Sequence, residues 1–122
     1  MATLQDFQFL SYIDGVDQYL FIRRDGHIVS HNFEDPENSV SAVAMIAMNC
    51  EALQRDMGNK RCLYCQFQRS SGQHLIVFLL GNYYLCILQR PDRDNATTIE
   101  NIITYLKKLT LERVNHSGII TK

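Results

Sequence analysis

The sequence predicts an α+β domain in which a five-stranded antiparallel sheet is covered by helices on both faces. Short glycine-containing turns separate several strand-like stretches, which favours antiparallel pairing. Three of these stretches, 19–22, 75–80 and 83–88, are apolar without interruption, so both sheet faces need a cover there. Three further stretches carry apolar residues at helical spacing, one near each end of the chain and one in its middle.

Size and composition fit one domain. The chain has 122 residues, of which 46% are hydrophobic and 20% charged, and these values exclude a mostly disordered chain. Its net charge of −1 lacks the basic excess that is usual in nucleic-acid binders. No apolar run approaches the roughly 20 residues that span a bilayer, and the first residues lack signal-peptide features. We expect a cytoplasmic protein with one domain over residues 1–114 and a flexible C-terminal tail over 115–122.

The N-terminal part is expected to form a short helix and a hairpin. Apolar residues at near-helical spacing lead to Gly15, which is a natural helix stop. The β-rich stretch 19–22 and the more polar, alternating stretch 27–31 then flank Asp25-Gly26. This dipeptide predicts a two-residue hairpin turn between them.

The middle helix has the clearest start in the sequence. Asp35 can cap the free backbone amides and Pro36 suits the first helical position. The helix is expected to run to about Met57. One of its sides carries Val40, Val43, Ala44, Ala47, Cys50 and Gln54, and a different side carries Met45, Met48 and Ala52. A helix that packs on one sheet needs a single apolar face, so the second face requires a partner.

Three more strands and a last helix complete the chain. Residues 61–69 alternate in polarity, which suits a strand at the edge of the sheet. Gly81-Asn82 is expected to turn the chain between two apolar strands, and Thr97 with Glu100 predicts a capping box at the start of the last helix. If hairpin partners stay adjacent, the strand order is 2-1-5-4-3. The middle helix then covers one face and the two terminal helices cover the other, as a three-layer α/β/α domain.

The residues show no arrangement typical of an enzyme or of a metal centre. Cys62 and Cys65 have zinc-like spacing, but positions three apart in a strand point to opposite faces, and no second cysteine pair exists. His27 and His31 share one face of a polar strand, where solvated histidines are the ordinary case. No phosphate-binding loop is present. We expect no enzymatic activity, no cofactor and no bound metal, and we expect the four cysteines to be free thiols.

In their order, lengths and hairpin glycines, these elements resemble the roadblock / dynein light-chain family over roughly residues 3–113. The matching stretches are Asp14-Gly15-Val16, Phe21 to Ser30, Ser41 to Ala47, and Leu79 to Leu88. The resemblance implies a roadblock-like or profilin-like fold. Family members are non-enzymatic homodimers or heterodimers that dock onto small Ras-like GTPases or act as scaffolds in motor and signalling complexes.

The resemblance also implies where two subunits meet. In the family the third strands pair into one continuous sheet with the middle helices beside it, which would bury the edge strand and the second apolar helix face of this chain. The predicted dimer interface comprises Met45, Met48, Ala52, Cys62, Leu63, Tyr64 and Cys65. The alternative is that Met45 and Met48 fill the monomer core. For partner docking, the resemblance indicates exposed middle-helix positions, for which we take Asn49, Arg55 and Asp56.

The leading hypothesis is therefore a homodimeric regulator or scaffold that binds a small Ras-like GTPase, without membrane insertion or nucleic-acid binding. One alternative is a small-ligand sensor, because the same strand order occurs in PAS-like domains. A sheet covered on both faces argues against it, since little room is left for a cavity. The other alternative is a structural subunit of a larger assembly without a GTPase.

Overall fold

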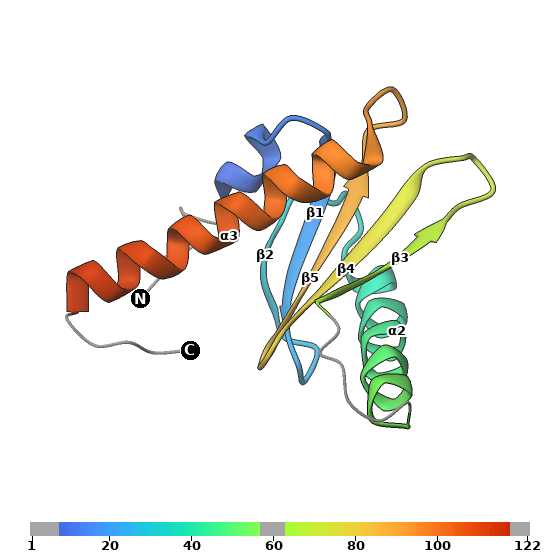
Figure 1. Ribbon diagram of the computed structural model, residues 1–122. Coiled ribbons are helices and arrows are strands. Elements are labelled where there is room, and N and C mark those ends of the chain that lie inside the picture. The colour runs from blue at the N-terminus through green and yellow to red at the C-terminus, as the bar shows by residue number, and fades with distance from the viewer. Residues whose placement is uncertain (1–7, 57–62, 118–122) are drawn as a thin grey trace.

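The computed structural model describes the backbone of residues 8–56 and 63–117, and their side chains up to residue 108. A five-stranded antiparallel sheet in the order β2-β1-β5-β4-β3 lies between helices (Figure 1). The predicted fold class and strand order are confirmed. The elements are η1 (Phe9–Tyr12), β1 (Val16–Arg23), β2 (Ile28–His31), α2 (Glu37–Asp56), β3 (Tyr64–Gln68), β4 (His74–Leu80), β5 (Tyr83–Gln89) and α3 (Asn95–Ser117).

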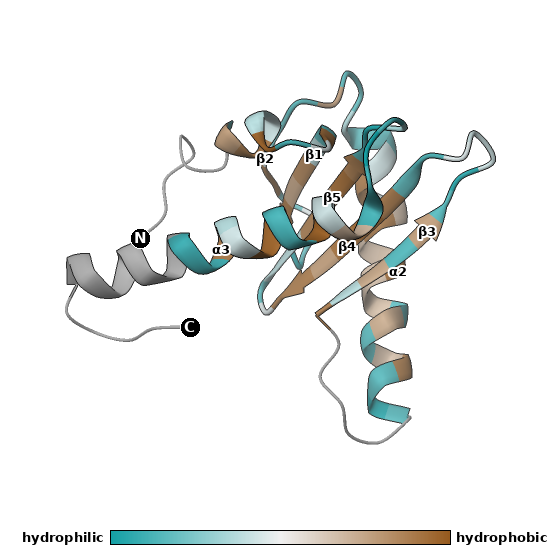
Figure 2. Cartoon of the chain, turned by 45° about the horizontal axis from the view of Figure 1, so that its top comes forward, coloured by the Kyte–Doolittle hydropathy of each residue, from teal (hydrophilic) through white to brown (hydrophobic). Residues whose placement is uncertain are grey.

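Side-chain alternation along the central strands divides the core into two layers. On β1, Tyr19 and Phe21 belong to the cluster that packs against η1 and α3, whereas Leu20 and Ile22 belong to the cluster that packs against α2. The same alternation on β4 and β5 explains why these strands are apolar on both faces (Figure 2). As expected, α2 covers one face of the sheet, while α3 and the short 3-10 helix η1 cover the other (Figure 1).

The first hairpin differs from the expected two-residue turn. The amide of Arg23 donates to the carbonyl of His27 at 2.8 Å, so three residues connect the strands. Gly26 has a φ of +93° and its amide donates to the carbonyl of Arg23 at 2.9 Å. A three-residue loop with a left-handed glycine at its end is a common alternative to the two-residue turn. At the other end of the sheet, Gly81-Asn82 joins Leu80 to its direct partner Tyr83, as predicted.

The last helix begins earlier than its predicted capping box. The carboxylate of Asp94 accepts hydrogen bonds from the amide and the hydroxyl of Thr97, at 2.9 and 2.7 Å. These bonds hold the pKa of Asp94 below its ordinary value. The cap is therefore Asp94, three residues before the expected Thr97. The helix α3 continues through residue 117, past the expected domain end at 114.

Gly15 marks the close approach of the start of β1 to α3. Its φ is +99°, and a Cβ placed on it would lie 2.1 Å from the Oγ1 of Thr98. Thr98 is itself buried, and its hydroxyl donates to the carbonyl of Asp94 at 2.8 Å. Only glycine satisfies both the backbone angle and the space at this position.

Some predictions fall outside the described residues. These are the start of the first helix within residues 1–7, the exit of α2 at Gly58-Asn59, and residues 118–122 of the expected tail. Of the helices within the described chain, none is both long enough and apolar enough to cross a bilayer.

Candidate functional site: the exposed apolar surface of α2 and β3

The large apolar side chains left in solvent concentrate on α2 and on the edge strand β3, including Leu63 directly before that strand. Only Phe9 and Tyr12, on η1, are found elsewhere among the described residues. The α2–β3 surface comprises Met45 (63% exposed), Met48 (55%), Leu53 (59%), Leu63 (55%) and Phe67 (43%). Single exposed apolar residues are ordinary, whereas a group on two neighbouring elements is typical of an interaction site. β3 is also the terminal strand of the sheet, and its outer edge offers backbone groups to another strand.

The helix part of the predicted dimer interface is accessible. Met45 and Met48 are more than half exposed, so the alternative that they fill the monomer core is wrong. The small Ala52 is half-buried on the same helix. Val43 and Ala47 instead face the sheet and are buried, at 3% and 0% exposure. The two apolar sides expected of this helix are therefore present, and the side that carries Met45 and Met48 is largely open to solvent.

The strand part of the predicted interface is divided between the two faces of the sheet. Leu63 is exposed, and its carbonyl accepts a hydrogen bond from the amide of Leu79 at 2.9 Å. The half-buried Tyr64 packs on the α3 face, with its ring 5.6 Å from that of Phe78. Cys65 points to the α2 face, as the alternation predicts. Cys62 lies outside the described residues.

Cys65 is not a free thiol. It forms a disulfide with Cys50, whose Cα lies 6.9 Å away, and this bond joins α2 to β3. The expectation of free thiols is therefore wrong for these two residues. It was based on the spacing of the cysteines in the sequence and on the expected cellular compartment. The disulfide forms because α2 crosses the sheet so that Cys50 faces Cys65 on β3. Cys86 is free and buried, and burial raises the pKa of its thiol to about 12. Such a thiol is inert at neutral pH.

The docking positions lie near the C-terminal end of α2. Asn49, Arg55 and Asp56 are all exposed, and no described contact distinguishes them as a site. Glu51, on the same half of the helix, was not identified from the sequence. Its carboxylate accepts hydrogen bonds from Arg24 at 2.6 Å and from the hydroxyl of Tyr84 at 2.9 Å.

This three-residue cluster anchors the end of α2 to the sheet. The guanidinium carbon of Arg24 also lies 5.7 Å from the centre of the Tyr84 ring. Burial, followed by the bond to Glu51, raises the pKa of Tyr84, and the bond to Glu51 raises that of Arg24. No sequence signal brings residues 24, 51 and 84 together, because their meeting depends on where the helix crosses the sheet.

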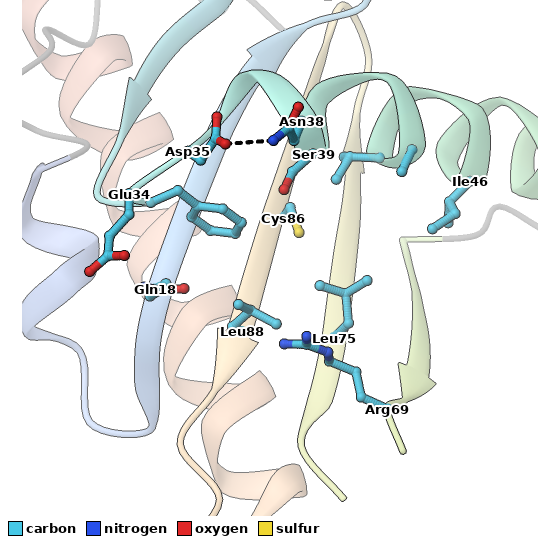
Figure 3. Close-up of a pocket in the computed structure, with 13 residues that line it drawn as sticks. Gln18, Glu34, Asp35, Asn38, Ser39, Ile46, Arg69, Leu75, Cys86 and Leu88 are labelled. Carbon is cyan, nitrogen blue, oxygen red and sulfur yellow. Dashed lines mark hydrogen bonds between the residues drawn. The ribbon is translucent and has the colours of Figure 1, made fainter. Parts of the chain in front are cut away.

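A cleft lies beside α2 on the same face of the sheet. Its volume is about 430 Å³. Leu75 and Leu88 lie on its floor, Ser39 and Ile46 on its helix side, and Arg69 at its β3 end (Figure 3). The cleft is open to solvent on one side, so it is a surface depression beside the helix, distinct from a cavity enclosed between sheet and helices.

The described part of the chain was expected to hold no metal centre, and its acidic, histidine and cysteine side chains do not gather into one. No group of three or more histidine, cysteine, aspartate or glutamate side chains there could hold a metal ion. His27 and His31 are exposed, and Nδ1 of His31 lies 3.1 Å from the carbonyl oxygen of Phe33.

Comparison with known proteins identifies the fold. No protein-family model matches the sequence, and no curated protein does. Among solved structures, MglB of Myxococcus xanthus superposes with a TM-score of 0.73 at 12% identity, covering 87% of this chain and 89% of that one. A roadblock/LC7 domain from Streptomyces avermitilis gives 0.63 at 17% identity, covering 84% and 89%. LokiProfilin1, solved in complex with rabbit actin, gives 0.59 at 15% identity, covering 87% and 92%.

Identities this low show a common architecture and leave the activity of the chain open. The likeness extends over most of this chain and most of each neighbour. It includes the roadblock/LC7 domains that the sequence resembles and also the profilins, which share the sheet and its covering helices. The protein has the roadblock/LC7 fold.

Proposed function

We propose that the protein is a non-enzymatic homodimer that binds a small Ras-like GTPase as a regulator or scaffold. The observation that carries the proposal is the α2–β3 surface, whose exposed apolar side chains lie on α2 and beside the open edge of the sheet in a roadblock fold. A second copy placed on this surface by a two-fold axis pairs β3 with β3 and covers the outer side of α2 in one interface.

The proposed GTPase site adjoins the helix pair of that dimer. Asn49, Arg55 and Asp56 are exposed polar positions on the half of α2 that also carries Met48 and Leu53. A polar rim around an apolar centre is the usual anatomy of a protein interface. The chain contributes no inserted catalytic arginine in this proposal. Any effect on hydrolysis comes from ordering the catalytic loop of the GTPase itself.

Light scattering behind a sizing column tests the dimer and the partner together. The wild-type protein is expected at about twice its chain mass, and heavier with a Ras-like GTPase loaded with a non-hydrolysable GTP analogue. The double variant M45E/M48E should run as a folded monomer, since it places four charges in a symmetric apolar interface. A matched control is Y12E, which introduces glutamate at an aromatic residue that is 81% exposed on the opposite face.

Each outcome decides one part of the proposal. A dimeric M45E/M48E protein would show that α2 is not the interface. A wild-type protein that runs as a monomer would refute the proposed dimer and would leave the assignment of the fold unchanged. A dimer whose mass never shifts with nucleotide-loaded GTPase would favour a structural subunit of a larger assembly.

A further inference from the structure

The cleft beside α2 exists because the helix covers only part of its sheet face. Neighbouring strands place Gln18, Leu88, Leu75 and Phe67 side by side in one row across that face. Gln18, Leu75 and Leu88 line the cleft, and so does Cys86, which belongs to the next row and lies closer to the helix (Figure 3). The result is an open apolar floor, and the cleft volume of about 430 Å³ falls within the range of small-molecule sites.

One cation faces this floor. Arg69 follows β3, and Figure 3 shows its guanidinium beside Leu75 and Leu88. Its one described side-chain hydrogen bond is a long one, 3.3 Å from Nη1 to Oε1 of Gln73. Within the described residues it forms no ion pair, in contrast to Arg23, Arg24, Arg90 and Arg93. A guanidinium with free donors beside an apolar surface matches a carboxylate that carries a hydrocarbon body.

The opposite rim restricts the charge of such a ligand. Glu34 and Asp35 border the cleft across from Arg69, and Asp35 already accepts a hydrogen bond from the side chain of Asn38 (Figure 3). Two carboxylates oppose one guanidinium, so a polyanion such as a nucleotide or a phosphorylated sugar is repelled. A single carboxylate can pair with Arg69 while its apolar body keeps away from the acidic rim.

We propose that this cleft binds a small monocarboxylate with an apolar body, with Arg69 holding the carboxylate and Leu75 and Leu88 contacting the body. The volume equals that of about 14 water molecules at about 30 Å³ each. A medium-chain monocarboxylate such as octanoate is smaller than this volume and therefore fits within the cleft. The inference goes beyond the proposed binding of a GTPase and does not depend on it, because the cleft is complete within one chain.

The first test is an amide chemical-shift titration of the full, isotope-labelled chain with octanoate, and with octan-1-ol as the uncharged probe. Octanoate should shift the amides of Ile46, Leu75 and Leu88 at millimolar concentration, and octan-1-ol should bind about fivefold more weakly. Equal binding of both probes would overturn the pairing with Arg69. Absence of these shifts, or shifts confined to Met45 and Met48, would overturn the site.

Two variants and one control separate a built site from general adsorption. R69Q should weaken octanoate about fivefold and leave octan-1-ol unchanged, since it removes the guanidinium charge and keeps a polar side chain at this position. K107Q removes one positive charge from exposed α3 on the other face of the sheet and should bind octanoate as the wild type does. A42F adds a ring at an exposed helix position that lines the cleft and should block both probes. Wild-type affinity for octanoate in R69Q would refute the proposal.

Discussion

Replacing Gly15 by alanine tests the account of how β1 approaches α3. The φ of +99° is unfavourable for any residue with a Cβ and costs about 1–2 kcal/mol. The new Cβ would also lie 2.1 Å from Oγ1 and 2.9 Å from Cβ and Cγ2 of Thr98. Thr98 is 1% exposed and hydrogen-bonded to Asp94, so it has little freedom to move away. Overpacking of this kind adds about 1–3 kcal/mol, and G15A should lose roughly 2–5 kcal/mol of unfolding free energy.

Gly72 offers a matched control. Its φ is +91°, but a Cβ there meets nothing within 4 Å, so G72A carries the backbone cost alone. Urea unfolding followed by circular dichroism gives both free energies. G15A should be the less stable variant by about 1–3 kcal/mol. Equal losses would show that the contact with Thr98 relaxes freely and that the tight start of β1 is not a packing constraint.

Three further predictions concern the contacts that hold α2 and α3 in place. E51A should lose about 2 kcal/mol of unfolding free energy, measured with urea, because the buried hydroxyl of Tyr84 loses its acceptor. E51Q should lose less, because its amide oxygen can still accept that hydrogen bond. Equal losses in the two variants would contradict the contact between Glu51 and Tyr84. Reduction of the α2–β3 disulfide, whose cysteines are 15 residues apart, should lower stability by about 3 kcal/mol; an unchanged urea midpoint with reductant would contradict it. Because the pKa of Asp94 is lowered in the folded state, this residue stabilises the fold at pH values above its ordinary pKa of 3.8, and that contribution is lost as the pH falls through the folded-state pKa. D94N should therefore flatten the acid side of a curve of unfolding free energy against pH.

The sheet was predictable because strand signals are local. Unbroken apolar runs identify the two strands joined by Gly81-Asn82, and the polar alternation of residues 61–69 places that strand at an edge. The exposed outer side of α2 was also predictable, because helical periodicity separates Met45 and Met48 from Val43. Each of these features depends on spacing within a single element.

The features that were missed depend on how one element lies across another. The Cys50–Cys65 disulfide and the floor of the cleft at Leu75 and Leu88 follow from the angle at which α2 crosses the sheet. No pattern within α2 or within a strand encodes that angle. The start of α3 was missed for a different reason, because Asp94 competes locally with Thr97 for the same role and both satisfy the rules for an N-cap.

The pairing of β1 with β5 has a consequence for how the chain folds. Two blocks of strands, β1–β2 and β3–β4–β5, are each built from local hairpins. The seam between them instead pairs Phe21 with Leu85, which lies far along the sequence from it. Closing that long loop costs entropy before any contact across the seam compensates for it. We expect the seam to form in the rate-limiting step, with a ribosome-bound chain unable to complete either core layer until β5 has emerged.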